Sequence, residues 1–325
     1  MSRVTTHITP RLEKEQHDMT TIDAITKTAG TLAEAYEPEA LARAFWTLIC
    51  EPNDLVAGEL ISTLGPIDAL EVAMGTPELT DSEDLATLKE RVTARANANQ
   101  FAQVLRSTAR FGVQLVTPDS DYWPKGMNDL GNAAPFALWV RGNAELLTGA
   151  DQIAIVGARA ATGYGEHVTM ELAAGLSDRG RTIVSGAAYG IDGMAHRATL
   201  ASHGNTIAYL AGGVDRYYPS GHDALLTRIA EEGAVVSELP VSSPPTKWRF
   251  IARNRLIAAA THATIVVEAG WRSGSLNTAG HAHFLGRAVG AVPGPATSAA
   301  SAGCHRLIRD YGATLITNTD EAVEL

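Results

Sequence analysis

The sequence contains few cysteines, no long apolar run and no excess of positive charge. Its two cysteines, Cys50 and Cys304, cannot build a disulfide framework or a CxxC metal pair. A membrane-spanning helix needs about 18 or more consecutive apolar residues, and no such run occurs. The N-terminal segment also lacks the apolar stretch of a signal peptide. We therefore expect a cytoplasmic protein without a membrane partner.

The net charge of −10 argues at first against a nucleic-acid-binding protein. The acidic residues are unevenly distributed, however. Residues 1–100 hold 17 Asp and Glu against 8 Lys and Arg, whereas residues 101–325 hold 19 against 18, of which 16 are arginine. Because the guanidinium group forms forked contacts with phosphate, a local basic site is expected in the second part, without a broad basic face.

The N-terminal third is predicted to be helical. Residues 1–22 are polar and irregular and are predicted to be disordered. Residues 23–109 are predicted to form a small all-α domain, with helices beginning near Pro38 and Pro52. Residues 82–110 are expected to form one long helix.

Residues 110–325 are expected to form an extended Rossmann-like domain. Two short β-type runs at residues 113–116 and 136–140 precede a regular alternation of apolar runs and helical segments. This alternation predicts an α/β fold with a doubly wound, mostly parallel sheet. The strands expected in the alternating part are Ile153–Val156, Thr182–Ser185, Thr206–Leu210, Ala234–Glu238, Ala263–Glu268, Ala288–Val292 and Ala313–Ile316. Ligands of such sheets bind beyond the carboxyl ends of the strands, so the residues there are the candidates for function.

The first two strand ends carry glycines in a pattern that differs from a dinucleotide-binding motif. The loop after the first alternating strand contains Gly157, Arg159 and Gly163, and Arg159 is placed where it can bind a phosphate. The next strand ends in Ser185-Gly186, and not in the acidic residue that would bind a ribose 2′-hydroxyl. Both differences argue against a dinucleotide. The alternative is that the glycines only permit tight turns.

The acidic and histidine residues near the strand ends do not suggest a metal or a catalytic centre. Asp192 is expected to cap a helix, and His196 to make a structural hydrogen bond. His281 and His283 are two apart in a helix and do not share a face, so a zinc pair is not expected. Glu268 has no evident acid or nucleophile as partner and is expected to pair with an arginine. We therefore predict no catalytic residue, no metal ligand and no cofactor.

The densest basic and aromatic cluster spans residues 247–255, KWRFIARNR, after the fourth alternating strand. Basic residues bind the phosphates of single-stranded nucleic acid while aromatic rings stack on its bases. The alternative is a solvated amphipathic helix start with Phe250 in the core, and for Arg255 taken alone this alternative stays open. After the next strand, Ser273-Gly274 opens a helix and forms another nest that accepts anions.

Taken together, these motifs resemble the DprA/Smf family of DNA-processing proteins. The matching motifs cover about residues 115–317 in the family's order and spacing, which makes the set specific. They are Tyr122-Trp123-Pro124, Val156-Gly157-Ala158-Arg159, Gly163-Tyr164-Gly165, Ser185-Gly186, Gly190-Ile191-Asp192, Ala195-His196, Asp215, Tyr218-Pro219, Ser237-Glu238, Phe250, Arg253-Asn254-Arg255, Val267-Glu268-Ala269, Ser273-Gly274-Ser275, Pro293-Gly294 and Gly312-Ala313.

The resemblance implies an extended Rossmann fold that binds single-stranded DNA without chemistry. It also implies a homodimer that protects incoming DNA and loads the RecA recombinase in natural transformation or related recombination. The residues that it assigns to DNA binding, together with the strand-end glycines and serines, are Gly157, Arg159, Gly163, Ser185, Gly186, Lys247, Phe250, Arg253, Asn254, Arg255, Ser273 and Gly274.

The sequence departs from the family pattern at three places. Tyr189 stands where many relatives carry a basic residue, which puts one phosphate contact in doubt. The family often appends a small winged-helix domain, and the sequence ends at Leu325, so we expect the function of that domain to be absent. The N-terminal part resembles the family's sterile-alpha-motif-like domain only in position and composition.

Two other functions compete with this interpretation. The first is a nucleoside-monophosphate phosphoribohydrolase-like enzyme on a related Rossmann-like fold. Such enzymes carry a Pro-Gly-Gly-x-Gly-Thr-x-x-Glu motif, which does not occur here. The second is an NAD-binding regulator, which the missing acidic residue at the second strand end disfavours.

Overall fold

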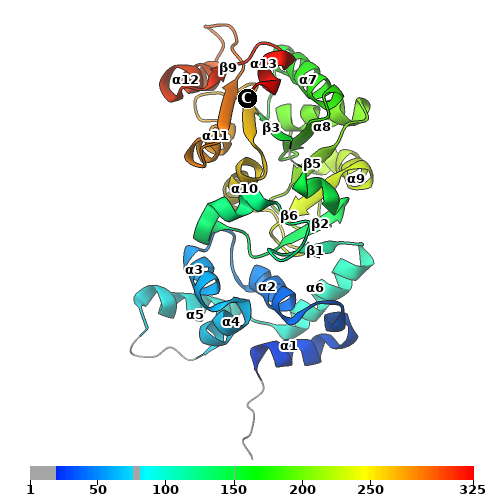
Figure 1. Cartoon of the computed structure of the whole chain (residues 1–325), viewed down its shortest axis with the longest axis vertical. Coiled ribbons are helices and arrows are strands. Elements are labelled where there is room, and N and C mark those ends of the chain that lie inside the picture. The colour runs from blue at the N-terminus through cyan, green and yellow to red at the C-terminus, as the bar shows by residue number, and fades with distance from the viewer. Residues whose placement is uncertain (1–19, 76–80, 150) are drawn as a thin grey trace, which may run out of the picture.

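The computed structural model describes residues 20–75, 81–149 and 151–325 (Figure 1). The predicted disordered segment therefore lies outside the described residues up to position 19. Helix α1 begins at Thr21, slightly before the helical domain was expected to begin, and the Thr20 side chain caps it by accepting from the Asp23 N–H.

The N-terminal part is all helical, as expected. Its elements are α1 (Thr21–Ala29), η1 (Gly30–Ala35), α2 (Pro38–Ile49), α3 (Leu55–Leu64), α4 (Pro66–Met74), α5 (Glu83–Arg95) and α6 (Ala98–Arg110). The single helix expected over residues 82–110 is wrong, because α5 ends at Arg95 and α6 begins at Ala98. Asn97 accounts for the break: its side chain accepts from the Gln100 N–H, a bond that favours a new helix start over a continuous helix.

The remaining residues form one mostly parallel sheet. Its strands are β1 (Gln114–Val116), β2 (Leu138–Gly142), β3 (Gln152–Val156), β4 (Thr182–Ser185), β5 (Thr206–Tyr209), β6 (Ala234–Ser237), β7 (Ala263–Val266), β8 (Ala288–Ala291) and β9 (Thr314–Leu315). They are hydrogen-bonded in the order β1-β2-β6-β5-β4-β3-β7-β8-β9. Pairing is parallel from β6 to β9, whereas β1 and β2 form an antiparallel edge. The predicted doubly wound sheet is confirmed.

Helices cover both faces of this sheet (Figure 1). They are α7 (Gly163–Asp178), α8 (Ile191–Ala201), α9 (Asp223–Glu232), α10 (Lys247–Ala260), α11 (Ser275–Phe284), α12 (Ala302–Tyr311) and α13 (Thr319–Val323); short 3-10 turns are η2 (Lys125–Ala133), η3 (Ala144–Thr148) and η4 (Ser220–His222). Side chains of β3 alternate between the two faces: Ile153 and Ile155 pack under α7 and α8, while Ala154 and Val156 pack under α10 and α11. The helices α7 and α8, which follow β3, therefore lie on one face of the sheet, and α10 and α11, which flank β7, lie on the other.

The N-terminal helices share a core with the edge of the sheet. One hydrophobic cluster joins residues of α2 and α6 to Trp139 of β2 and Val235 of β6. The Trp139 indole N–H donates to Thr47 of α2 at 3.2 Å. Arg249 of α10 forms a two-pronged ion pair with Glu51, at 2.9 and 3.0 Å. The first turn of α10 is thus fixed against the N-terminal helices.

A second, buried ion pair fixes the middle of α10. The Arg255 guanidinium donates to both carboxylate oxygens of Glu238, just after β6, at 2.7 and 2.6 Å. Its Nε donates to the Ala133 carbonyl at 2.9 Å. Both side chains are more than nine-tenths buried, so the pair is shielded from water and depends on both partners.

None of the helices within the described ranges has the length and apolar character required to cross a membrane.

We predict that Glu238→Gln strongly destabilises the protein. Removing one partner of a buried pair leaves the Arg255 charge uncompensated and costs about 3–5 kcal/mol. Urea denaturation followed by circular dichroism measures the change. Glu232→Gln is the control, because its pair with Arg228 is exposed on α9 and should leave the midpoint unchanged. Equal midpoints for the two variants would contradict a structural role for the buried pair.

Candidate functional site

A groove of about 820 Å³ lies beyond the carboxyl ends of β3 and β7. This is the point at which the crossovers divide between the two faces of the sheet, the usual position for a ligand in a doubly wound fold. Its lining includes the loop after β3 with Arg159, the first turns of α10, and the loop before α11 with Ser273, together with Asp192 and Tyr218. We call it the central groove.

The first turns of α10 present one face to the central groove. The Thr246 side chain caps the helix by accepting from the Arg249 N–H. Lys247, Phe250, Ile251 and Asn254 then recur at the i, i+3, i+4, i+7 spacing of a single helix face, and all four line the groove. The helix therefore directs only part of the basic and aromatic cluster at residues 247–255 into the groove.

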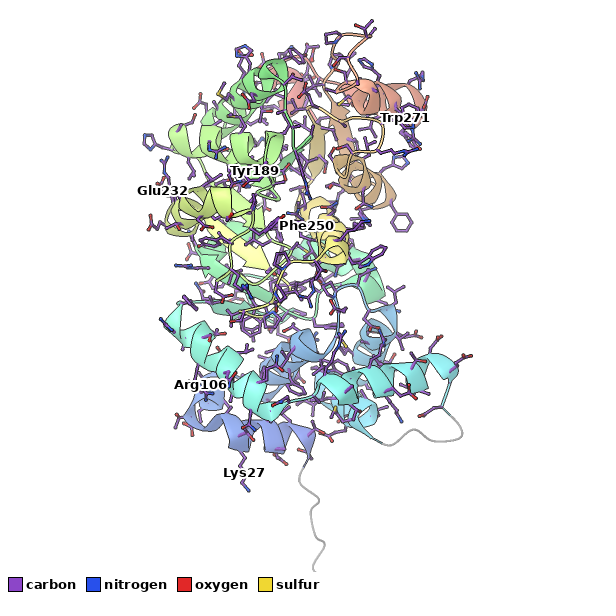
Figure 2. The ribbon with its side chains drawn as sticks, turned by 180° about the vertical axis from the view of Figure 1, so that it is seen from behind. Lys27, Arg106, Tyr189, Glu232, Phe250 and Trp271 are labelled. Atoms are coloured by element: carbon purple, nitrogen blue, oxygen red, sulfur yellow. The ribbon has the colours of Figure 1, made fainter. Side chains whose placement is uncertain are left out.

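Aromatic and basic side chains pack against one another in the central groove. The Phe250 ring lies 5.4 Å from the Tyr218 ring, centroid to centroid, at an interplanar angle of 58°. The Arg159 guanidinium carbon lies 5.1 Å from the centroid of the Phe250 ring. Phe250 is half-buried and in Figure 2 occupies the middle of the molecule. Its position is that of a groove wall, so the alternative of a core phenylalanine does not hold.

The central groove is basic although the protein is acidic. Its lining includes four basic side chains, Arg159, Lys247, Arg253 and Arg272, and one acidic side chain, Asp192. Arg159, Lys247 and Arg272 form no ion pair with any residue that the structure describes. Their charges are therefore available to an anionic ligand.

Arg253 lies beneath the groove. Burial lowers the pKa of Arg253 to about 10, an effect that the nearby Asp192 carboxylate opposes. The side chain thus stays charged at neutral pH. It donates to the Tyr209 carbonyl at 2.5 Å. It contributes positive charge to the floor of the groove without reaching solvent.

The Asp192 carboxylate occupies the anion position at the ends of β3 and β4. It accepts from the Gly157 N–H at 3.4 Å and from the Gly186 N–H at 3.1 Å. Burial raises the pKa of Asp192, and the Arg253 charge and these backbone donors act in the opposite direction. Backbone donors that cradle a phosphate in other doubly wound proteins are here occupied by a side chain of the same chain.

Glu268 fills the corresponding position at the start of α7. Its carboxylate accepts from the Thr162 N–H at 2.8 Å and from the Thr162 hydroxyl at 2.6 Å. The expectation that Glu268 pairs with an arginine is therefore wrong. A carboxylate at a helix N-terminus is favoured by the helix dipole and excludes an external anion from the same place.

The central groove brings together eight of the residues predicted to bind DNA. They are Gly157, Arg159, Lys247, Phe250, Arg253, Asn254, Ser273 and Gly274. Asn254 also links the two helices at the groove, because its amide donates to the Gly274 carbonyl at 3.4 Å and to Asn277 at 3.1 Å.

Four predicted residues lie elsewhere. The Ser185 hydroxyl is buried and donates to the Ile155 carbonyl, and the Gly186 N–H is bonded to Asp192. Gly163 is the first residue of α7 and follows Thr162, whose side chain caps the helix and whose N–H is bound to Glu268. Arg255 is 2% exposed and bound to Glu238, so the solvated alternative is wrong as well. None of these four residues lines the central groove, because their polar groups are bound to other parts of the chain or lie away from it.

Among the groove residues that the predicted set leaves out are Tyr218 and Arg272. Tyr218 lies in a loop after β5, and the contact of its ring with Phe250 depends on tertiary structure. Arg272 directly precedes the predicted Ser273-Gly274 nest, so its position in the sequence was a usable signal. Tyr189 contacts the segment that follows Tyr218: its hydroxyl accepts from the Gly221 N–H at 3.2 Å.

The sequence predicts no metal site. His196, one of the residues considered there, has a hydrogen-bond partner within the protein. His196 is buried, and its Nδ1 lies 2.7 Å from the Thr206 hydroxyl. Burial lowers the pKa of His196 to about 3, so the imidazole is neutral at physiological pH. Within the ranges that the structure describes, no group of three His, Cys, Asp or Glu side chains is arranged to hold a metal ion.

Comparison with known proteins gives consistent family matches. The model of the family described as DNA recombination-mediator protein A matches residues 114–325. A putative DNA processing protein DprA of Mycobacterium tuberculosis is 45% identical over 299 residues, covering 89% of this chain and 75% of that protein. The DNA processing protein DprA of Bacillus subtilis is 32% identical over 283 residues, covering 85% and 93%.

Two solved structures of DNA processing protein A are similar as well. The protein from Streptococcus pneumoniae superimposes with a TM-score of 0.71 at 28% identity, covering 87% of this chain and 95% of that chain. The protein from Helicobacter pylori, described for its single-stranded DNA binding mode, gives 0.59 at 30% identity, covering 65% and 94%.

We predict that NAD and NADP do not bind this protein. Asp192 and Glu268 occupy the backbone donors that would receive a pyrophosphate, and Ser185 replaces the acidic residue for the ribose. Isothermal titration calorimetry should show no binding heat with either dinucleotide, under conditions in which a Rossmann dehydrogenase gives a clear signal. Micromolar affinity would contradict the assignment of these two carboxylates.

Proposed function

Because the chain belongs to the DNA recombination-mediator protein A family, we propose that it binds single-stranded DNA in the central groove and performs no chemistry on it. The observation that carries the proposal is the stack of Tyr218, Phe250 and Arg159 beside unpaired basic side chains. Such a combination matches the two parts of a single strand, its bases and its phosphates.

Phosphates are bound by the groove's unpaired cations and by a helix end. Arg159, Lys247 and Arg272 all line the groove and form no ion pair with the residues that the structure describes. Helix α11 begins at Ser275 without a side-chain cap, and Ser273, Gly274 and Ser275 at its N-terminus line the groove. The positive end of a helix dipole attracts an anion at this position. A strand in the groove therefore meets three unpaired cations and a helix N-terminus, although the N-terminal helices are acidic.

Bases are bound by stacking. A base placed on Phe250 extends the existing contacts of that ring with Tyr218 and Arg159. Every base has a face that can stack, so binding is tolerant of sequence. A base in a duplex is already stacked and paired, and opening it costs free energy. The groove therefore favours single strands over duplex DNA.

The family relationship supports three finer proposals. We infer that the protein forms a homodimer, that it acts in the cytoplasm to protect incoming single strands, and that it loads the RecA recombinase onto them. Light scattering with and without DNA measures the assembly, and a mass of one protomer in both conditions would exclude the dimer. Filament formation by RecA on strands already covered by this protein measures the transfer, and no acceleration would exclude it.

The phosphoribohydrolase-like enzyme is the alternative function. Its motif is missing from the sequence, and the acidic side chains at the strand ends are engaged in backbone hydrogen bonds. A carboxylate held in this way is poorly placed to activate water or to stabilise a ribosyl cation. Incubation with AMP and an assay for free adenine separates the two functions.

We predict selective binding of single strands. Fluorescence anisotropy with an oligothymidylate and a duplex of equal length should show much tighter binding of the single strand, because only unpaired bases reach Phe250. Competition by unlabelled duplex provides the control for charge alone. Equal affinities would contradict the proposed groove mechanism.

We predict different effects for Arg159→Ala and Phe250→Ala. Arg159→Ala removes one phosphate contact and should reduce the slope of log K against log salt by about 0.7. Phe250→Ala removes a stacking platform worth about 1–3 kcal/mol, or about 5- to 150-fold in affinity, and should leave the slope unchanged. Titrations at several salt concentrations measure both quantities.

Controls keep this comparison interpretable. Arg106→Ala changes an exposed arginine of α6, far from Phe250 in Figure 2, and should bind like the parent protein. Since Arg159 stacks on Phe250, the double variant should lose less affinity than the sum of the single losses. Thermal melts identify unfolded variants. Folded single variants with parental affinity and slope would show that DNA binds elsewhere.

A further inference from the structure

A second hollow adjoins the central groove. It has a volume of about 540 Å³ and lies between α11 and α12, with Leu276 and Leu307 in its apolar lining. Arg272 and Ser273 line both the hollow and the central groove. The two depressions therefore meet at the loop before α11, and a ligand leaving the groove past Ser273 enters this α11–α12 hollow.

The α11–α12 hollow exposes three aromatic rings. Trp271 is 55% exposed, Tyr311 49% and Phe284 87%. Trp271 lies at the junction with the central groove and is seen in Figure 2 above Phe250, beside the helices at that end of the sheet. Exposed aromatic side chains gathered in one depression form an apolar patch of the kind that marks a binding surface.

A basic side chain is combined with these rings. The Arg306 guanidinium carbon lies 5.0 Å from the centroid of the Trp271 ring and 5.3 Å from that of Tyr311, and Arg306 donates to the Tyr311 hydroxyl at 2.8 Å. Arg306 forms no ion pair with the residues that the structure describes. The arrangement repeats that of Arg159 and Phe250 in the central groove, a cation held over an aromatic face.

We propose that the single strand continues from the central groove across Arg272 and Ser273 into the α11–α12 hollow, where a base stacks on Trp271 and phosphates contact Arg272 and Arg306. This proposal rests on the proposed function of the central groove. Three features support nucleic acid as the occupant: the continuity of the two depressions, the repeated pairing of arginine with an aromatic ring, and the unpaired charges on both sides of the junction.

Tryptophan fluorescence provides a direct probe. Trp46, Trp123 and Trp139 are buried, whereas Trp248, at the start of α10, is 74% exposed. In a Trp248→Phe variant, Trp271 is the exposed tryptophan that responds to a stacked base. Oligothymidylates of about 4 to 16 nucleotides cover the range of known single-strand site sizes. We expect that the shortest strands bind without quenching Trp271, and that quenching begins above a threshold length.

Affinity measurements with Trp271→Ala complete the test. This variant should bind the shortest strands like the parent protein and should lose about 5- to 150-fold in affinity for the longest. Tyr122→Ala, which removes an exposed aromatic ring outside both depressions, is the matched control and should change neither. Arg306→Gln should reduce the salt slope by about 0.7 for long strands only.

The outcomes separate this proposal from the proposed function. Failure of the parent protein to bind strands of any length would overturn the central groove as well. Normal binding with an unquenched Trp271, or equal affinity of Trp271→Ala for all lengths, would overturn only the extended path. A change of mass in sedimentation of Trp271→Ala with parental DNA affinity would assign the hollow to a second copy of the chain and would also overturn it.

Discussion

The Asp192 carboxylate holds together the part of the fold on which the site depends. It binds the N–H groups of Gly157 and Gly186, and so joins the loops that follow β3 and β4. An unmade hydrogen bond at a buried backbone group costs about 1–3 kcal/mol, which makes this carboxylate a strong constraint on both loops. The loop after β3 is thereby held where Arg159 reaches Phe250. The same bonds occupy the donors that a dinucleotide would need, so the constraint that builds the groove also excludes another ligand.

Helix α10 converts a short basic and aromatic segment into several functions. Consecutive positions of a helix differ by about 100° in direction, so Arg255 lies about 140° around the axis from Phe250. Phe250 faces the central groove, Arg249 pairs with the N-terminal helices, and Arg255 is buried against Glu238. Positive charge in this segment is thus divided between ligand binding and attachment of the helix. The attachment matters for binding, since a stacking platform must be held in place before a base arrives.

A protein of net charge −10 can bind DNA when its cations lack internal partners. In the central groove Arg159, Lys247 and Arg272 are unpaired, while many other arginines of the described residues lie in ion pairs, as Arg249 does with Glu51. The distribution of partners, more than the total charge, sets the local potential. The proposed extension over Trp271 and Arg306 follows the same principle, with a cation supported by aromatic rings in place of a carboxylate.

The sequence by itself determined the alternating strands and helices, the position of the site at the strand ends, and the family motifs, because these depend on local periodicity and on short segments. It singled out Arg159, Lys247 and Phe250, and all three line the central groove. Only the tertiary structure decided which turns keep backbone N–H groups free to bind an external anion. Asp192 binds the N–H groups of Gly157 and Gly186, and Glu268 binds the Thr162 N–H from 106 residues further along the chain, so these turns are already occupied. Tyr218 joined it through a contact between distant loops, which no local pattern encodes.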